Sequence, residues 1–326
     1  MTFEHHLTEF AGLPVAAYPT DPAAPLPDPG GPCAWHLAAF FGDQDWDEMA
    51  DLDEVFQNFL ERVDTSRVEA LIVGAWDESA YEGSPVDLVV AAAARFPNLR
   101  ALFWGDILRE QSDVAYIQHP PLTRLLEAFP NLTELWVRGR SENSLVPLVE
   151  PTKHERLNTL VFESGGLPAA TIRAIGECDF PELTHLEFYF GMPHYGGDAT
   201  PEDVAWLLAG DRFPKLRRLG LRDSILQDDL AAAVAHAPVV AQLEVLDLSL
   251  GTLGDEGAAA LLAGQPLHHL RKLDLHHHYV SDKVVERLQA AWPGVEVDTS
   301  EQDDGRTWRQ AFGSPPREDR YIAVSE

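Results

Sequence analysis

The chain repeats one short motif, which is complete for the first time as FPNLRALFW at residues 96–104. Close copies follow as FPNLTELWV (129–137), FPELTHLEF (180–188) and FPKLRRLGL (213–221). Looser copies are TSRVEALIV (65–73), HERLNTLVF (154–162), VAQLEVLDL (240–248) and LHHLRKLDL (267–275). Each copy reads apolar-x-x-apolar-x-apolar, and the copies recur about every 29 residues, a spacing typical of stacked repeats. Eight copies in one register predict a repeat protein.

The segments between the motifs have helical character. Ser84-Pro85 and Thr200-Pro201 each place an N-cap residue before a proline, and Gly210 is a suitable helix stop. The other expected helices are at 121–129, 168–178, 228–237, 255–264 and 281–291. A strand, a helix and a return to the next strand make a parallel right-handed crossover. Single units cannot bury their own apolar side, so they must stack. The prediction is an α/β solenoid, a curved horseshoe with parallel strands on the concave face and helices on the convex face.

These motifs make residues 65–297 resemble a leucine-rich-repeat array with long, helix-bearing repeats, similar to the ribonuclease-inhibitor subclass. One feature departs from that pattern, because the usual asparagine after the third apolar position is replaced. The replacing residues are Ile107, Arg140, Gly165, Ser224, Gly251 and His278. An asparagine ladder is therefore not expected.

Several shorter stretches resemble a bacterial family of leucine-rich-repeat proteins without an assigned activity. They are ESGGLP (163–168), YGGDAT (195–200), GLRDS (220–224), LDLSLGTLGDEGA (246–258) and LHHHY (275–279). The resemblance implies an accessory role beside modifying enzymes of the ATP-grasp or radical type. The scarcity of lysine beside arginine, with abundant alanine and proline, also suggests a bacterial source with a GC-rich genome.

Three regions are predicted. Residues 1–64 form an amino-terminal segment and a capping strand–helix pair, in which a strand at 35–41 precedes an amphipathic helix at 43–63. Residues 65–297 form the array of about eight repeats, with a last edge strand at 292–298. Residues 298–326 form an acidic tail, whose end at 320–326 either adds a strand, lies in the groove or stays disordered.

The charge balance excludes several classes of partner. The 326 residues include 53 acidic and 24 basic side chains, giving a formal net charge of −29. Such a surplus argues against binding to nucleic acid or to anionic membranes. The amino terminus lacks the features of a signal peptide, and Cys33 and Cys178 form no metal-type pair. A cytoplasmic protein with two inert thiols is expected.

Strand alternation identifies the side chains on the concave face. The residues predicted to bind a partner there are Phe103, Trp136, Arg138, Glu163, Glu187, Tyr189, Arg222, Asp247, Asp274 and His276. Aromatic side chains dominate the first half of this set, and charged side chains dominate the second. An aromatic anchor beside polar orienting groups is typical of a recognition surface.

Two alternatives remain for these residues. In the first, the amino-terminal segment or the tail covers Phe103 and Trp136, while the charged residues form solvated cross-strand pairs. In the second, Asp274, His276 and His278 bind a divalent ion or form a hydrolase-type active site. No nucleophile elbow or phosphate-binding glycine loop accompanies those residues.

The interpretation that follows is a non-catalytic binding or scaffold protein without a cofactor, which recognises a protein or peptide on the concave face. Truncating Trp136 and Arg222 together to alanine is expected to abolish partner capture. On this interpretation the same truncation leaves the thermal midpoint nearly unchanged.

Overall fold

Each copy of the motif forms a β-strand that begins two residues after the first apolar residue of the motif. Those eight first residues are all buried: Val68, Leu99, Leu132, Leu157, Leu183, Leu216, Leu243 and Leu270. Each of these buried apolar residues fixes the point at which the chain enters the sheet. The predicted repeat register is therefore confirmed in the computed structural model, which describes residues 4–41, 49–76, 83–303 and 320–324.

The chain divides into two compact units. The first contains residues 1–163, 177–182 and 326, and the second contains residues 164–176 and 183–325. The division falls within the repeat array rather than at its predicted ends.

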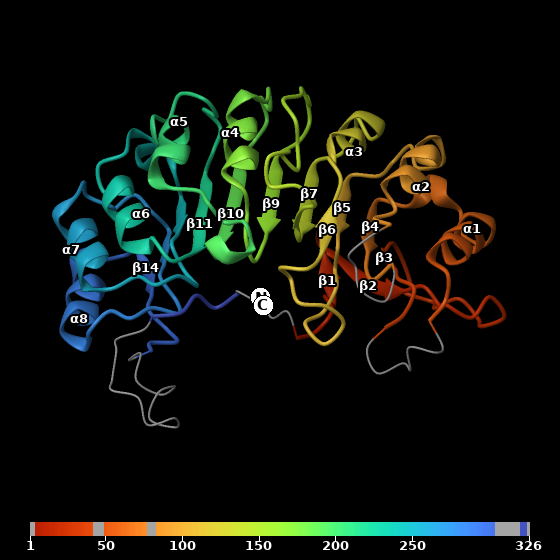
Figure 1. The fold of residues 1–326 in the computed structure, drawn as a ribbon, viewed down its shortest axis with the longest axis horizontal. Helices are drawn as coiled ribbons and strands as arrows, with labels where there is room; N and C mark the ends of the chain where they lie inside the picture. Colours follow the sequence, from red (N-terminus) through yellow and green to blue (C-terminus); the bar gives the residue numbers. More distant parts are fainter. Residues whose placement is uncertain (1–3, 42–48, 77–82, 304–319, 325–326) are drawn as a thin grey trace. The chain divides into compact units, whose positions relative to one another are not determined.

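In the first unit, six strands pair in parallel from β2 to β9. They are β2 (Leu13–Ala17), β3 (Ala34–Leu37), β4 (Ala70–Val73), β5 (Ala101–Trp104), β7 (Glu134–Arg138) and β9 (Thr159–Glu163). β1 (Glu9–Phe10) pairs antiparallel with β2, and β6 (Gln118–His119) pairs with β8 (Arg140–Ser141). The helices α1 (Leu52–Arg62), α2 (Val86–Ala91) and α3 (Thr123–Ala128) lie along one side of these strands (Figure 1).

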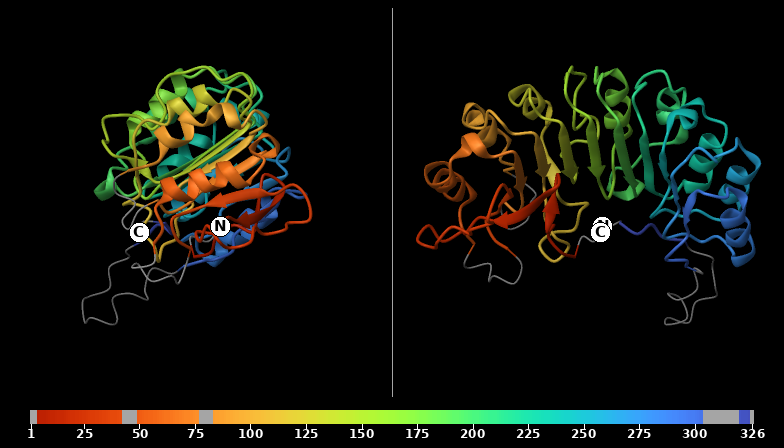
Figure 2. Two further views of the ribbon diagram at one scale, coloured as in Figure 1. Left: turned by 90° about the vertical axis from the view of Figure 1, so that its right-hand side faces the viewer. Right: turned by 180° about the vertical axis from the view of Figure 1, so that it is seen from behind.

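In the second unit, five strands pair in parallel in chain order. They are β10 (His185–Gly191), β11 (Arg218–Ser224), β12 (Val245–Asp247), β13 (Lys272–Asp274) and β14 (Glu296–Asp298). The helices are α4 (Ala169–Glu177), α5 (Ala205–Leu208), α6 (Gln227–Val234), α7 (Asp255–Ala263) and α8 (Asp282–Ala291). They also lie on one side of their strands, as the view from behind confirms (Figure 2). Parallel strands with helices on one side confirm the predicted α/β leucine-rich-repeat solenoid class.

The predicted helix starts differ in outcome. Thr200 opens a capping box, in which its amide donates to Asp203 Oδ2 at 2.9 Å. Ser84 makes no such cap, because its hydroxyl instead accepts from Trp104 Nε1 at 3.2 Å. This contact shows that Trp104 points to the helix side of β5, so its neighbour Phe103 points to the other side. Gly210 ends its helix with φ +82°, as expected.

The strand and the helix predicted for the amino-terminal segment are present in the described residues, but β3 pairs with both β2 and β4, so β1 and β2 and not β3 form the start of the sheet. β3 covers 34–37, and α1 begins at Leu52 after Asp51, whose side chain accepts from Asp53 N. Residues 43–48 of the predicted helix lie outside the described residues. None of the helices in the described stretches combines the length and the hydrophobicity needed to span a lipid bilayer.

Candidate functional site

The residues predicted for the concave face lie on the side of each sheet opposite its helices, here called the strand face. In the first unit this face is covered at its start. Phe103 is 0% exposed, and it packs in a cluster with Phe10, Ile72 and Ala101, against which Leu7 and Leu13 also pack. The prediction that Phe103 is an exposed anchor is therefore wrong, because the amino-terminal segment covers this side chain. Trp136 remains half-buried beside it, at 6.0 Å between ring centroids, with Nε1 donating to Glu134 Oε1 at 2.7 Å.

Arg138 and Glu163 are also buried, at 1% and 0% exposure. Arg138 Nε donates to Glu163 Oε2 at 2.8 Å, and its Nη1 donates to Asp106 Oδ1 at 3.0 Å. Arg138 also lies over the Phe103 ring, 5.1 Å from its centroid. The predicted role of this pair as exposed binding residues is wrong, because one buried guanidinium pairs with two buried carboxylates. Freeing this guanidinium to bind a ligand would leave the buried carboxylates unpaired, at a large cost in free energy.

Asp106 reaches this cluster through an irregularity in the chain after β5. The amides of Gly105 and Asp106 both donate to Val73 O, at 2.8 and 3.0 Å, which is the pattern of a β-bulge. Gly105 has φ +89°, and a Cβ there would lie 2.5 Å from Arg138 O. The bulge needs glycine and turns the Asp106 side chain onto the strand face. Regular alternation after Trp104 would have placed it on the helix side.

Two histidines also surround Asp106. Its Oδ2 lies 3.0 Å from His6 Nδ1 and 3.8 Å from His36 Nε2. Burial alone would raise the pKa of Asp106, but the hydrogen bond from His6 and the charge of Arg138 hold it below the ordinary value. Burial lowers the pKa of His36 to about 3, so this imidazole is neutral. No spacing motif connects positions 6, 36 and 106, so the sequence alone does not single out these three residues.

The strand face of the second unit carries rows of charge in register. One row runs from Glu187 on β10 through Gly220 to Asp247, Asp274 and Asp298. The row before it contains His185, Arg218, Val245, Lys272 and Glu296. Cations on one row therefore lie beside carboxylates on the next, and we call these two rows the charge ladder.

Arg222 is the most deeply placed cation of the second unit's strand face. Its Nη1 lies 3.0 Å from Glu187 Oε2 and 2.7 Å from the Tyr189 hydroxyl, and its Nε lies 3.2 Å from Asp247 Oδ1. Its guanidinium also lies over the Tyr189 ring, 4.7 Å from the centroid. Arg222, Tyr189, Glu187 and Asp247 are all buried. They join neighbouring strands across the face, so in place of the expectation that Arg222 can be truncated without loss of stability we predict that its truncation destabilises the chain.

The pKa shifts follow from this pairing. Burial would raise the pKa of Glu187, but the hydrogen bond from His185 and the charges of Arg222 and Arg218 hold it well below its usual range. Burial raises the pKa of Asp247 above its ordinary value, against the opposing charge of Arg222. Burial acts on Asp274 in the same direction, but His276 and Lys272 outweigh it and keep the pKa well below the usual range.

The row of the charge ladder that contains His185, Arg218 and Lys272 is partly open to solvent. The Arg218 side chain is 41% exposed, with its Nε 2.7 Å from Glu187 Oε1. Lys272 is less exposed, and its Nζ lies 2.8 Å from Asp274 Oδ2 and 3.1 Å from Asp298 Oδ2. His185 lies 2.7 Å from Glu187 Oε1 and is partly exposed. The Arg218 and Lys272 cations and the His185 imidazole are thus held in place by carboxylates.

The histidines at 276–278 behave differently from one another. His276 Nδ1 lies 2.6 Å from Asp274 Oδ1 on the strand face. His278 is buried, with Nε2 bonded to Thr299 O at 3.0 Å and Nδ1 accepting from Val280 N at 3.0 Å. Both ring nitrogens are thus hydrogen-bonded to the backbone, so the alternative in which His278 is a metal ligand beside Asp274 and His276 is wrong. It occupies the position of the missing asparagine and supplies equivalent backbone bonds.

The last described segment, Arg320–Val324, packs on turns of the second unit and forms no regular secondary structure. Ala323 N donates to Leu250 O at 2.8 Å, and Val324 N donates to Asp223 Oδ1 at 2.9 Å. Asp223, near the end of β11, and Leu250 and His277, which follow β12 and β13, have positive φ. The segment therefore lies against the carboxyl ends of the strands.

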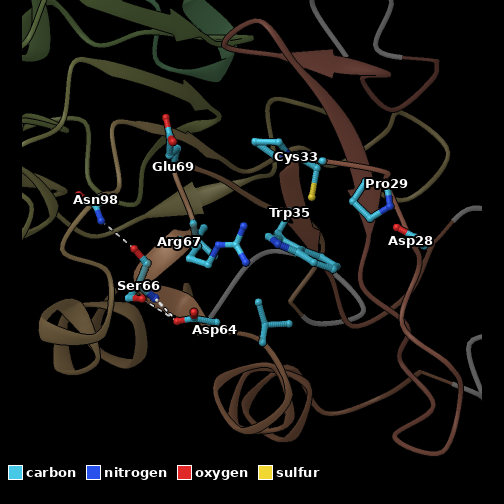
Figure 3. Close-up of a pocket in the computed structure, with 13 residues that line it drawn as sticks. Asp28, Pro29, Cys33, Trp35, Asp64, Ser66, Arg67, Glu69 and Asn98 are labelled. Atoms are coloured by element: carbon cyan, nitrogen blue, oxygen red, sulfur yellow. Dashed lines mark hydrogen bonds between the residues drawn. The ribbon is translucent and has the colours of Figure 1, made fainter.

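A cavity of about 550 Å³ lies at the amino-terminal ends of β3 and β4 in the first unit. Its walls include Cys33, Trp35 and Arg67, and the guanidinium of Arg67 points towards the indole of Trp35 (Figure 3). Burial raises the pKa of the Cys33 thiol, which makes it a poor nucleophile. The expectation of an inert thiol agrees with this environment.

No protein-family model and no curated protein matches the chain. Among solved structures, it is similar to a protein from Bacteroides fragilis, with 27% identity and a TM-score of 0.72 over 82% of this chain and 74% of that one. More distant likenesses are to an internalin from Listeria monocytogenes (15% identity, TM-score 0.34, covering 72% of this chain and 54% of that one) and to the leucine-rich repeat domain of APL1B (14%, 0.29, covering 82% and 65%). The Bacteroides fragilis structure supports the fold, and a fold alone does not define a function.

Proposed function

We propose that the chain is a non-catalytic binding protein that recognises a protein or peptide through the strand face of its second unit. The observation that carries this proposal is the charge ladder, in which buried carboxylates hold partly exposed cations in place. Arg218 and Lys272 are these cations, and the partly exposed His185 imidazole lies beside Glu187 in the same row. A partner that offers carboxylates or backbone carbonyls to this row fits its chemistry.

Preorganisation is the physical reason for placing binding here. A long cationic side chain that is free in solution loses about 0.5–1.5 kcal/mol of conformational freedom when a partner immobilises it. Arg218 and Lys272 are already held by Glu187, Asp274 and Asp298 before any partner arrives. Part of that cost is therefore met in the folded chain, which favours recognition by this row.

The finer features of the proposal come from sequence. The resemblance to the ribonuclease-inhibitor subclass and to bacterial repeat proteins supports an accessory role beside a modifying enzyme, in the cytoplasm. The net charge of −29 supports a partner that is neither nucleic acid nor a membrane surface. Trp136, which is half-buried on the first unit's strand face, is a second candidate contact.

The test is affinity capture from a lysate of the source organism, read by quantitative mass spectrometry. Wild type is compared with Arg218→Glu and with the matched control Arg217→Glu. Arg217 is an exposed neighbour whose Nη1 donates to Pro214 O and Leu216 O away from the ladder. We expect a partner that wild type and the control retain and that Arg218→Glu loses by roughly tenfold or more, as a reversed interfacial charge costs several kcal/mol. Equal capture by all three proteins contradicts the proposal.

A further inference from the structure

His6, His36 and Asp106 bring three metal-type donors together on the strand face of the first unit. One donor atom from each residue lies within 4.8 Å of the other two. The residues come from three separate segments: the chain before β1, strand β3 and the bulge after β5. The two imidazole rings meet edge to face with centroids 4.7 Å apart.

The histidine nitrogens here lack the partners that buried polar atoms normally have. His36 is 1% exposed, and its Nε2 has no hydrogen-bond partner among the described residues. The Nε2 of His6 is also buried and without one within that part of the chain, but it is His6 Nδ1 that faces Asp106. Buried polar groups are almost always satisfied, so the unsatisfied His36 Nε2, 3.8 Å from Asp106 Oδ2, indicates a missing partner.

Space for that partner depends on Gly74. A Cβ at this position would lie 2.5 Å from His36 Nε2, so any other residue would press on the nitrogen. The distances from Asp106 Oδ2 to the two histidine nitrogens also fit a bound metal ion. Ligands of a tetrahedral zinc at about 2.1 Å from the metal lie roughly 3.4 Å apart. The measured separations from Asp106 Oδ2, 3.0 Å to His6 Nδ1 and 3.8 Å to His36 Nε2, lie on either side of that value.

We propose that His6, His36 and Asp106 bind one divalent transition-metal ion of the zinc class. Two imidazoles and one carboxylate are ligands that such ions accept, and three protein ligands leave a further coordination position. The His6 side chain is 20% exposed, which gives the ion a route from solvent.

The surroundings of Asp106 suit this role. Arg138 Nη1 donates to Oδ1 and orients the carboxylate so that Oδ2 faces the histidines. Outer contacts of this kind commonly hold metal ligands in position. Arg138 also pairs with Glu163, so the three charged groups sum to one net negative charge, which a cation compensates.

A second group of similar composition shows the contrast. Asp274, His276 and Asp298 also lie within 4.8 Å of one another in the second unit. There Lys272 Nζ lies 2.8 Å from Asp274 Oδ2 and 3.1 Å from Asp298 Oδ2. An ammonium group already supplies the cation at that place, so we assign the ion to the first unit.

The experiment uses full-length protein purified without a histidine tag, stripped with chelator and titrated with Zn²⁺ by calorimetry. We expect one zinc per chain and a rise in the thermal midpoint at saturating zinc. His6→Ala should weaken zinc binding by at least about 100-fold, since loss of an outer contact alone costs roughly 10–100-fold. His5→Ala is the matched control, because His5 is an exposed neighbour, and it should stay within about twofold of wild type.

Two further variants exclude other outcomes. His276→Ala should leave zinc binding unchanged, and Asp106→Asn, which keeps an oxygen for Arg138, should lose it. The Asp106→Asn measurement also replaces His6→Ala if circular dichroism shows that the latter fails to fold. The proposal is overturned by the absence of stoichiometric zinc binding. It is equally overturned by binding that His6→Ala and Asp106→Asn leave intact, or by binding that depends on His276.

Discussion

Arg222 and Glu187 form the central ion pair of the second unit's strand face, with Nη1 of the arginine 3.0 Å from Oε2 of the glutamate. The pair joins neighbouring strands β11 and β10, and both side chains are buried. Around it lie the Tyr189 hydroxyl and the Asp247 carboxylate. Charge pairing and hydrogen bonding therefore join neighbouring strands at a buried place in the sheet.

Arg222→Ala should lower the free energy of unfolding by about 3–5 kcal/mol, because it leaves Glu187 and Asp247 as buried charges without their main counter-ion. Urea unfolding measures the change. Arg217→Ala removes the same charge from an exposed position and should change stability by less than about 0.5 kcal/mol. An unchanged midpoint for Arg222→Ala would contradict the burial and pairing described for this residue.

Phe10→Ala should destabilise the chain by about 3–5 kcal/mol, as is usual for a truncated core phenylalanine. Phe10 is 4% exposed and covers Phe103, with ring centroids 6.0 Å apart. The same change should increase the fluorescence of an apolar dye under conditions where the chain stays folded, because Phe103 becomes accessible. Glu9→Ala, at an exposed position in the same strand, should do neither. Dye binding that is equal in both variants would show that Phe10 is not the cover.

Asp223→Asn should make stability less dependent on pH. Burial raises the pKa of Asp223 well above its ordinary value of 3.8, so the folded chain binds this proton more tightly than the unfolded chain does. The resulting stabilisation is complete below the unfolded pKa and is lost as the pH rises through the folded pKa. Asparagine has no proton to lose, accepts from Val324 N through its own oxygen, and tolerates the φ of 56° at this position.

Unfolding of wild type and Asp223→Asn is compared from about pH 4 to about pH 8. The variant should gain on wild type as the pH increases. The exposed Asp211→Asn serves as the control for the loss of one carboxylate and should run parallel to wild type. A constant difference between wild type and Asp223→Asn over this range would mean that the Asp223 carboxyl does not titrate with folding.

His278→Ala should be more harmful than His278→Asn. The imidazole serves Thr299 O and Val280 N, and each buried group left unsatisfied costs about 1–3 kcal/mol. Asparagine offers one donor and one acceptor and can restore part of the loss. Thermal unfolding measures both variants, with the exposed His268→Ala as the control. Equal losses for alanine and asparagine would show that packing of the ring, rather than its hydrogen bonds, is what matters.

The repeat pattern predicted the fold well because it depends on local chemistry. An apolar residue such as Leu99 must be buried wherever it recurs at this spacing, and the strand two residues later follows from that anchor. Alternation likewise placed Arg138 and Arg222 on the correct side of their strands. Alternation could not predict how deeply each side chain is buried, since the sequence pattern is the same for exposed and buried positions on that face.

Contacts between distant segments explain the remaining differences. Phe103 is buried by Phe10, and no local pattern connects the two residues. Asp106 meets His6 and His36 only because a bulge breaks the alternation after Trp104. The adjacent histidines at 5–6 and the glycine before Asp106 were the visible signals, and neither specifies a partner without the fold.

The bulge at Gly105 also sets a limit on which residue the chain can carry at this position. A side chain there is opposed both by the φ of +89° and by Arg138 O, so a substitution favours regular pairing after β5. Regular alternation would turn the Asp106 carboxylate towards the side on which Trp104 packs, while Arg138 would retain only Glu163 as a counter-ion. Tolerance to substitution at Gly105 is therefore decided by electrostatics, even though the residue replaced carries no side chain.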